Sequence, residues 1–385
     1  MKLSLRAEIL ADSSTMIRVA FLIDRLRRAG TEAQLLALLR GLDRSRIEPH
    51  LILLDGSDAE SQSLEPSHCP VSRLGVCSFK HPRAAIQAWR LAAYLRRHRI
   101  DILQTYFLDS VYFGVPVARL AGVRAVVRVR NNLGYWLTPK HKRLGRWYGR
   151  WVHRTVTNSN EGRDALVAAE GLPADRIVVL ENGVDTDRFD CCPPPFQHAD
   201  LIRIGAVANL RPVKRLDLLI EAIAALRTQF PQVRLALAGN GPERERLQQL
   251  AADRGILDAT EFVGAVSDVP AFLSTIDIAV LCSDSEGMSN AILEYMAAGR
   301  AIVATRVGAN ERLLRNETDG LLIPSGSPEA LAQAISRLLA DPAMACDLGV
   351  SARRRAREEF SREASCRRFE TFYEELTIKK VRKAA

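Results

Sequence analysis

Short apolar runs and amphipathic stretches alternate along almost the whole chain. In the first half, runs with the apolar density of buried strands occupy residues 17–24, 48–54, 100–104 and 125–129. Stretches with apolar side chains at helical spacing lie between them, at residues 31–41, 82–97 and 110–121. Because strand–helix–strand alternation is typical of a parallel sheet between helices, the first half is predicted to be a doubly wound α/β domain.

The alternation restarts after residues 193–195, which are three consecutive prolines. Such a run excludes a helix or a central strand and makes a stiff spacer. Strand-like runs then occupy residues 202–208, 233–239, 259–263, 276–281, 301–305 and 320–323. Helical patterns occupy residues 215–229, 242–254 and 343–377, the last interrupted near residues 360–361. The second half is therefore predicted to be another domain of the same class.

The predicted fold is α/β, with two Rossmann-like, doubly wound domains that face each other across a cleft. A chain of 385 residues is too long for one ordinary core, and a cleft between two domains is a common ligand site. The predicted segments are an N-terminal extension (1–16), a first domain (17–190), a proline-rich linker (191–199), a second domain (200–360), and a C-terminal helix returning to the first domain with a basic tail (361–385).

Composition narrows the class of protein. Hydrophobic residues make up 47% and charged residues 26%, as in soluble globular proteins. No run reaches the roughly 18 apolar residues of a membrane span, and residues 1–16 lack the apolar core of a signal peptide. Seven cysteines without metal-ligand spacing predict free thiols. We therefore expect a cytoplasmic protein, at most peripheral on the inner face of the plasma membrane.

The positive charge lies in the first half. The net charge is +9; the first 190 residues hold 29 Lys and Arg against 20 Asp and Glu, whereas the rest hold 25 of each. A basic half suits a phosphorylated ligand, an anionic membrane or nucleic acid, and it also serves solubility.

Two acids eight residues apart, Glu286 and Glu294, flank a predicted helix start, with Ser289 or Asn290 as its N-cap. The free N–H groups of residues 288–290 at the positive helix end would suit a diphosphate, and the carboxylates could accept hydrogen bonds from sugar hydroxyls. The alternative is structural: Glu294 would support the helix start and Glu286 would be a solvated loop acid.

A second candidate follows the strand at residues 202–208, where Arg211 and Lys214 precede a helix. Two cations at a strand's carboxyl end can hold phosphate oxygens, although a solvated surface turn would have the same composition. Gly239 and Gly241 follow the next strand and permit close backbone approach, but they do not complete a G-x-G-x-x-G fingerprint.

Three features of the first half suit a ligand. Gly30 follows the first strand and either lets a ligand approach the backbone or belongs to an ordinary turn. Arg130, Asn131 and Asn132 follow the strand at 125–129 and suit a sugar or an acceptor. Residues 140–154 carry six Lys and Arg among aromatic residues, which predicts a basic helix at a membrane surface, with a solvated helix or nucleic-acid binding as alternatives.

Taken in order, these motifs resemble those of retaining glycosyltransferases of family 4 (glycosyl transferases group 1), which have the GT-B fold. The match runs from about residue 17 to residue 372. Residues 30–32 resemble the family's glycine-containing loop, residues 157–160 and 179–189 the segments closing its first domain, residues 209–214 its phosphate-binding turn, and residues 286–294 its acid–seven residues–acid signature. The acid signature alone is short, but the ordered set is specific.

The resemblance implies that Glu286 contacts the donor sugar and that Lys214 and Arg211 neutralise the leaving diphosphate, so that no metal ion or other cofactor is required. The implied donor-binding residues are Gly30, Asn209, Gly239, Gly241, Val266, Gly287, Met288, Ser289, Asn290 and Glu294, the last holding the ribose. The chain departs from the family where Arg130, Asn131 and Asn132 stand in place of a histidine that helps to position the donor sugar.

The resulting hypothesis is a retaining enzyme that moves a hexose or N-acetylhexosamine from a nucleotide diphosphate sugar, with UDP favoured, to a hydroxyl of a lipid-linked or polysaccharide acceptor in cell-surface glycan biosynthesis. Its expected partners are donor, acceptor and an anionic membrane surface contacted through residues 140–154, and not nucleic acid. Two alternatives stay open: an epimerase or phosphorolytic enzyme of the same fold, and a non-catalytic scaffold that binds nucleotide sugar or membrane.

Overall fold

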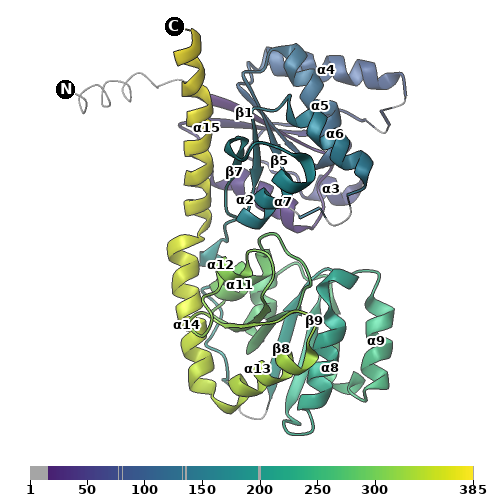
Figure 1. The fold of residues 1–385 in the computed structure, drawn as a ribbon, viewed down its shortest axis with the longest axis vertical. Coiled ribbons are helices and arrows are strands. Elements are labelled where there is room, and N and C mark those ends of the chain that lie inside the picture. Colours follow the sequence, from purple (N-terminus) through teal and green to yellow (C-terminus); the bar gives the residue numbers. More distant parts are fainter. Residues whose placement is uncertain are drawn as a thin grey trace, which may run out of the picture. The chain divides into compact units, whose positions relative to one another are not determined.

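The computed structural model describes residues 16–384, except residues 77, 80, 132, 135, 136 and 198–200; side chains are described to residue 378. The chain forms two compact units. Unit 1 contains the chain up to Asn158, Gly162–Leu180 and the segment from Ser365, and unit 2 contains Ser159–Glu161 and Glu181–Ala364. Each unit is a parallel sheet covered by helices (Figure 1), which confirms the predicted class of two doubly wound α/β domains.

The sheet of unit 1 has seven parallel strands. They are β1 (Ile17–Ile23), β2 (Ile47–Leu53), β3 (Val71–Arg73), β4 (Ile102–Tyr106), β5 (Ala125–Val129), β6 (Arg154–Thr157) and β7 (Ile177–Val179). In space they follow the order β3-β2-β1-β4-β5-β6-β7, so the order reverses between β1 and β4. In an open α/β sheet, ligands bind outside the strand carboxyl ends at such a reversal.

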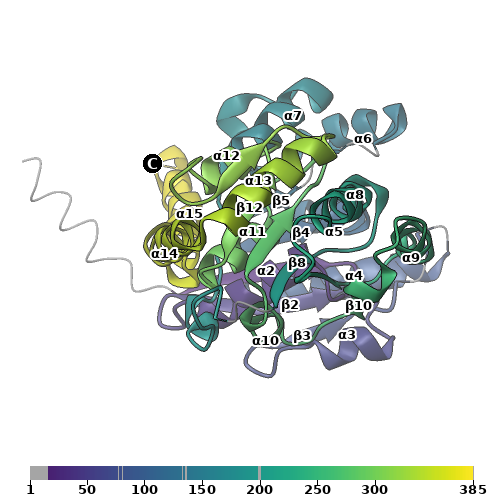
Figure 2. The same ribbon diagram turned by 90° about the horizontal axis from the view of Figure 1, so that it is seen from below.

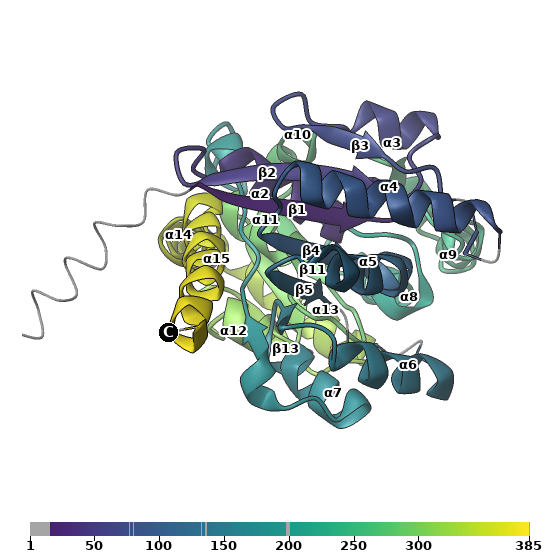
Figure 3. The same cartoon turned by 90° about the horizontal axis from the view of Figure 1, so that it is seen from above.

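Alternate residues of β1 serve two hydrophobic cores, because successive strand side chains point to opposite faces. Phe21 packs in the core that also holds residues of α2 (Gly30–Gly41) and α15 (Arg362–Ala384). Leu22 packs in the core formed with α4 (Arg83–Arg97) and α5 (Phe107–Ala121), against which α6 (Pro139–Gly149) also lies. On this face α5 lies between α4 and α6 (Figures 1 and 3). Two shorter helices of the chain are α3 (Ala59–Ser63) and α7 (Asn160–Glu170).

The sheet of unit 2 has six parallel strands. They are β8 (Ile202–Val207), β9 (Val233–Ala238), β10 (Thr260–Gly264), β11 (Ile278–Leu281), β12 (Ala301–Thr305) and β13 (Leu321–Ile323). The order β10-β9-β8-β11-β12-β13 reverses between β8 and β11. The helices are α8 (Leu216–Leu226), α9 (Arg244–Asp253), α10 (Val269–Ser274), α11 (Asn290–Ala297), α12 (Asn310–Leu313), α13 (Pro328–Ala340) and α14 (Pro342–Glu359). In Figure 2, α8 and α9 lie on one side of this sheet and α14 on the other.

The division between the units differs from the predicted one. The contacts place it at Leu180 and Glu181, before the prolines, and the segment that contains the prolines packs on unit 2. Phe189 and Cys192 are buried in a core of that unit, and the buried Arg300 donates a hydrogen bond to the carbonyl of Pro193. The prolines are therefore part of unit 2 and not a spacer between two domains.

Three further predictions are corrected or lie outside the described residues. The helix predicted from residue 110 begins at Phe107, whose φ is 62°. The helix predicted over residues 140–154 ends at Gly149, and Arg154 begins strand β6. Residues 1–15 of the predicted N-terminal extension and the side chains of the basic tail are not described.

Candidate functional site

The strongest candidate site of unit 2 lies where two loops leave the sheet at the reversal between β8 and β11. The loop after β8 ends in a short 3-10 helix (Pro212–Lys214), and the loop after β11 leads to α11. The backbone N–H of Asp284 donates to the carbonyl of Val213 at 2.9 Å and ties the two loops together. Two motifs separated by about seventy residues of sequence thus form one site, as parallel strand order permits.

Lys214 and Glu286 meet directly in this site. The Lys214 Nζ lies 2.6 Å from the Glu286 Oε1, and the Ser283 hydroxyl donates to the same oxygen at 2.6 Å. Both charged side chains are partly buried. The second carboxylate oxygen of Glu286 takes no part in these bonds. An acid held in this way can accept a hydrogen bond from a ligand hydroxyl while a cation stands beside it.

Arg211 stands at the start of the same short helix and is exposed. Within the described residues its guanidinium pairs with no carboxylate, so its charge is available to an anion. Arg215, which the sequence analysis did not select, instead closes the turn with a φ of 47° and ion pairs to Asp217 and Asp284. One cation of the loop is therefore structural, and two can serve a ligand.

The glycines after β9 allow two loop backbones to approach each other. A Cβ on Gly239, whose φ is 136°, would lie 1.8 Å from the carbonyl oxygen of Ala208, and one on Gly241 would lie 2.3 Å from that of Leu210. These glycines thus position the loop that carries the exposed Asn209. Predicted as donor-binding residues, they have a demonstrable packing role in the structure.

The three residues Met288, Ser289 and Asn290, before and at the start of α11, differ in what they can offer. Ser289, one of the two predicted candidates, is the N-cap, and its hydroxyl accepts from the N–H of Ile292. Met288 is buried, and its sulfur accepts from the N–H of Asn182 at 3.2 Å. The Asn182 side chain also donates to the Asn290 Oδ1 at 2.8 Å. The side chains of Met288 and Asn290 therefore bind protein, and the backbone N–H of Met288 at the helix start can serve an anion.

Gly287 and Glu286 are held from behind by the turn that precedes α12. The N–H of Ala309 donates to the Gly287 carbonyl at 2.9 Å. Gly308 has a φ of 52°, and a Cβ there would lie 2.0 Å from the carbonyl oxygen of Glu286. The sequence analysis did not select Gly308. Its position against Glu286 makes Gly308 a support of the loop between β11 and α11, which carries Glu286 and is called the acid loop below.

Glu294 lies on α11 with its side chain largely enclosed by protein and partly exposed to solvent. Burial raises its pKa to about 7, and Arg188 alone opposes this rise. Among the described residues no group donates a hydrogen bond to its carboxylate. An unpaired, desolvated acceptor of this kind gains from a ligand hydroxyl that supplies the missing hydrogen bond. Val266, another predicted donor-binding residue, is a partly buried residue packed on the core beside this helix.

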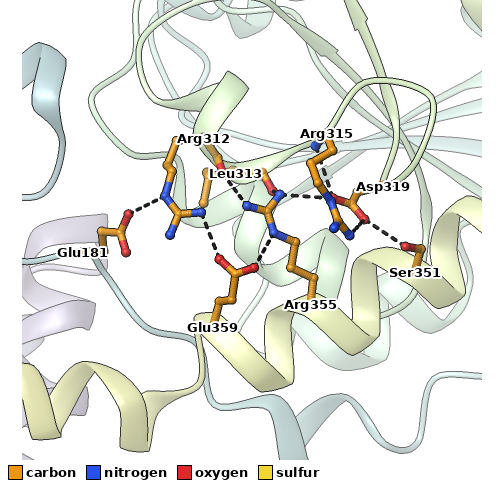
Figure 4. Close-up of polar contacts among 8 residues, drawn as sticks. All are labelled: Glu181, Arg312, Leu313, Arg315, Asp319, Ser351, Arg355 and Glu359. Carbon is orange, nitrogen blue, oxygen red and sulfur yellow. Dashed lines mark hydrogen bonds and ion pairs between the residues drawn. The ribbon is translucent and has the colours of Figure 1, made fainter.

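A charged network supports α12 from the other side (Figure 4). Arg355 on α14 is buried and donates to the carbonyls of Arg312 and Leu313 at 2.9 Å each, so that it caps the end of α12. Arg312 pairs with Glu181 at 3.0 Å and with Glu359 at 2.9 Å. Helix α12, which follows the turn that supports Glu286, is therefore fixed by buried and partly buried charges.

Unit 1 has a pocket of ≈ 180 Å³ at the reversal between β1 and β4. Its lining includes Thr31, which follows Gly30 at the start of α2, together with Arg130 and Asn131 after β5. The structure thus brings together two segments that the sequence analysis selected separately. Asn132, the third residue of the predicted group, lies outside the described residues.

The pocket also contains charged residues that the sequence analysis missed. Glu170 accepts from the buried Arg128 at 2.8 Å and from Arg130. Asp24 follows β1 and accepts from the N–H of Ser110 at 2.9 Å, which fixes it at the start of α5. Burial raises the pKa of Asp24 to about 6. Asp24 could be found from its position directly after β1, which borders the reversal, whereas Glu170 ends α7 and has no such signal.

Other classes of site find no support in the described part of the chain. No group of three His, Cys, Asp or Glu side chains in the described chain could hold a metal ion. No helix in the same part of the chain is long and apolar enough to cross a membrane. The six described cysteines are free thiols, and Cys282 lies beneath the site, with its Sγ donating to the carbonyls of Lys214 and Arg215.

Comparison with known proteins identifies the family to which the chain belongs. Residues 202–341 match the model of glycosyl transferases group 1, and residues 28–188 match that of Glycosyltransferase Family 4. A GDP-mannose-dependent alpha-(1-6)-phosphatidylinositol monomannoside mannosyltransferase of Mycolicibacterium smegmatis is 30% identical over 274 residues, which cover 64% of this chain and 71% of that protein. The lipopolysaccharide core biosynthesis glycosyltransferase LpsD of Rhizobium meliloti is 27% identical over 289 residues, 72% of this chain and 76% of that one.

Among solved structures, Anabaena Alr3699/HepE in complex with UDP superposes with a TM-score of 0.81 at 19% identity, over 93% of this chain and 100% of that one. A sucrose-phosphate synthase from Thermosynechococcus elongatus has a TM-score of 0.77 at 20% identity, over 94% and 100% of the two chains. At these identities the likeness shows the fold. Together with the family models and the relatives, it shows that the chain is a glycosyltransferase of family 4 (glycosyl transferases group 1) with the GT-B fold.

Proposed function

We propose that this glycosyltransferase moves a hexose or N-acetylhexosamine from a nucleotide diphosphate sugar, with UDP favoured, to a hydroxyl of a lipid-linked or polysaccharide acceptor in cell-surface glycan biosynthesis, with retention at the anomeric carbon. The observation that carries the proposal is the meeting of Lys214 and Glu286 at 2.6 Å beside the start of α11. A cation that can bind phosphate and an acid that can bind hydroxyls lie at one helix N-terminus. This pair suits a single ligand that carries both phosphate and hydroxyl groups.

The diphosphate is held by Lys214, Arg211 and the backbone N–H groups of residues 287–290. The charge that develops on the leaving phosphate is stabilised by these preorganised donors, which act without reorganisation during transfer. For this reason we propose that no metal ion is needed. The present Lys214–Glu286 bond keeps both side chains oriented, and the donor's phosphate competes for the Lys214 ammonium group.

Glu286 and Glu294 take different parts of the donor. The Glu286 carboxylate, anchored by Ser283, accepts from hydroxyls of the sugar. Glu294 lacks a donor among the described residues and accepts from the ribose hydroxyls. With two acids committed to hydroxyls, no acid is assigned as an enzymic nucleophile, and the leaving phosphate receives the acceptor's proton on the face from which it departs. That geometry retains the anomeric configuration.

The acceptor is assigned to unit 1. The pocket between Asp24, Thr31 and Arg130 has carboxylate, hydroxyl and guanidinium groups that suit a saccharide. The relatives named for phosphatidylinositol monomannoside and lipopolysaccharide core support a lipid-linked or surface glycan acceptor. The basic residues of α6 favour an enzyme that works at an anionic membrane surface, as proposed for residues 140–154.

The nucleotide of the donor can be identified by one screen. HepE in complex with UDP supports a UDP-sugar, whereas the mannosyltransferase named above is GDP-mannose-dependent. Thermal shift and donor hydrolysis with UDP-, GDP- and ADP-sugars should single out one nucleotide, because a ligand that binds the native state raises its stability by mass action. Stabilisation by all three bases alike, or by none, would contradict a specific nucleotide-sugar site.

The role of Glu286 is tested by Glu286→Gln, with Glu245→Gln as the control at an exposed acid on α9. We expect transfer to fall at least a hundredfold in the first variant and to be unchanged in the second, while both melt near the wild-type temperature. Near-normal transfer by folded Glu286→Gln would refute the assignment. Conversion of the free donor to its epimer without acceptor would favour the epimerase alternative.

A further inference from the structure

The exposed apolar side chains of unit 1 are not scattered evenly. Trp89 is 70% exposed and Ile86 is 59% exposed, both on α4, and Trp147 on α6 is 45% exposed. Phe79, in the loop before α4, is 42% exposed while its ring stacks on Phe113 of α5 at 5.8 Å. Large exposed apolar groups concentrated on one layer of helices mark an interaction surface.

Helix α4 carries apolar side chains on its outer side as well as on its inner side. Its inner side packs Leu91 and Leu95 into the core shared with α5. Its outer side carries Ile86 and Trp89, one turn apart, with Arg83 and Arg90 beside them, all of them exposed. An exposed side that combines an aromatic, an aliphatic and cations is typical of a helix that lies in a membrane interface.

Helix α6 adds charge to the same layer. It begins with a Thr138 cap and Pro139, and it exposes Lys140, Lys142, Arg143 and Arg146. Residues 82–99 contain five Arg, residues 139–154 contain six Lys and Arg, and neither segment contains Asp or Glu. Since α4 and α6 lie on either side of α5 on one face of the sheet, their charges add at one surface (Figures 1 and 3).

We propose that the α4–α6 face, formed by the exposed side chains of α4, α6 and Phe79, binds an anionic lipid bilayer. Its arginines and lysines are attracted to the anionic headgroups, and Ile86 and Trp89 enter the boundary between headgroups and acyl chains. This extends the proposed membrane contact of α6 by giving it an apolar anchor on α4. The aliphatic Ile86 decides against nucleic acid, which offers stacking and phosphate but no apolar phase.

The surface rests on the proposed function only in placing a lipid-linked acceptor at the membrane, and the test keeps the two apart. Full-length protein is sedimented with vesicles of pure phosphatidylcholine and with vesicles containing 30% phosphatidylglycerol. We expect binding to the second and little to the first. The Ile86→Ser/Trp89→Ser variant should lose at least tenfold in partition coefficient, whereas Val350→Ser, at a 69% exposed valine on α14, should bind as wild type.

The charge contribution is tested by Arg90→Gln against Arg354→Gln, two exposed arginines on helices of different units. Each Lys or Arg near an anionic surface contributes about 1 kcal/mol, so Arg90→Gln should weaken binding roughly fivefold and Arg354→Gln should not. Donor hydrolysis in solution should stay at the wild-type level in all four variants. If the wild-type protein hydrolysed no nucleotide-sugar donor, the proposed function would be refuted, and the vesicle result would be unaffected.

Three outcomes would overturn the membrane surface. The first is equal binding to both kinds of vesicle, or to neither. The second is binding that salt abolishes but the Ile86→Ser/Trp89→Ser variant does not change, which would leave charge alone without an anchor. The third is tight binding to a single-stranded oligonucleotide, or dimerisation lost in the same variant, either of which would assign the face to nucleic acid or to a second copy of the chain.

Discussion

At the scale of single residues, the candidate donor site depends on groups in unfavourable or strained environments. Glu294 is an acid whose pKa burial raises to about 7, and Gly308 adopts a φ of 52° against the Glu286 carbonyl. Arg211, Lys214 and Glu286 could be predicted from the sequence because each lies in a loop after a recognisable strand, and Glu294 because it lies eight residues after Glu286 in the predicted helix. Asn182 could not, since its partner Met288 lies about a hundred residues away and only the fold brings the two together.

Glu294→Gln should stabilise the protein at pH 8 and impair its use of donor. The folded-state pKa is raised from 4.5 to about 7, so the neutral form is favoured by folding; that stability is present below about pH 4.5 and is lost as pH rises through 7. Glutamine should therefore raise the unfolding free energy by roughly 1–3 kcal/mol at pH 8 and by much less at pH 5. Melting temperatures at both pH values, beside those of Glu245→Gln, check this.

The same substitution should raise the KM for the donor severalfold, because glutamine offers the ribose one acceptor oxygen in place of a carboxylate. In the wild type the KM should rise as pH falls through 7, and this dependence should be absent in Glu294→Gln. A variant with normal KM, or equal melting shifts at pH 8 and pH 5, would leave Glu294 without the assigned role.

Gly308→Ala should disturb the acid loop more than its backbone angle alone explains. An added Cβ would lie 2.0 Å from the Glu286 carbonyl oxygen, so the loop must move. Gly326→Ala is the matched control: its φ is 80° and nothing lies within 4 Å of the added Cβ. Both should lose about 1 kcal/mol for positive φ, and only Gly308→Ala should also lose transfer activity by tenfold or more. Equal activities in the two variants would contradict the supporting role of Gly308.

At the scale of elements, most segments with a clear apolar pattern were predicted, including the short strands β11 and β13, whereas the thirteen-residue helix α13 was missed. The strands β1 and β12 and the helices α4, α11 and α14 follow clear apolar patterns. The three- and four-residue strands β3, β6 and β7 were missed, because so few residues show no periodicity and their pairing partners define them. The proline run was misplaced for a related reason: its conformation followed from sequence, but its packing depends on Arg300, more than a hundred residues away.

Helix α12 is a short element whose stability must come from its surroundings. Its last carbonyls accept from Arg355, which also contacts the fully buried Asp319 at 3.1 Å (Figure 4). Although burial opposes it, hydrogen bonds from Arg315, Ser351 and Arg355 lower the pKa of Asp319 to about 2. The stability that Asp319 contributes is thus present above its unfolded pKa, near 4, and is lost as pH falls toward 2.

Arg355→Met should lower the unfolding free energy by about 3–5 kcal/mol, because it leaves two helix carbonyls without their donor and removes one of the cations that pair with the buried Asp319. Urea unfolding at pH 7 measures the loss, and hydrogen exchange of residues 308–314 should show α12 opening first. Arg354→Met, at an exposed neighbour on the same helix, should change stability by less than about 0.5 kcal/mol. Similar losses in both variants would mean that the Arg355 network does not fix α12.

At the scale of the whole molecule, the last segment of the chain belongs to a different unit from the segment that precedes it in sequence. Helix α15 follows unit 2 in sequence, yet Cys366, Phe372 and Tyr373 complete a core of unit 1. Tyr373 is fully buried, donates to the Gln104 Oε1 at 3.0 Å and meets Phe21 edge-on at 6.3 Å. The stability of unit 1 therefore depends on the last part of the chain, whereas Lys214, Glu286 and Glu294 of the proposed donor site belong to unit 2.

Tyr373→Ala should separate these two dependencies. Removing a buried aromatic ring costs about 3–5 kcal/mol, whereas Tyr373→Phe keeps the ring and loses only a hydrogen bond of about 1 kcal/mol. Hydrogen exchange should therefore rise in β1, β4 and α2 of Tyr373→Ala and stay low in β8 and β11, and the nucleotide sugar selected by the donor screen should still protect the loop that carries Glu286. If exchange rose equally in both sheets, the chain would unfold as one cooperative body, and donor binding would stabilise unit 1 as much as unit 2.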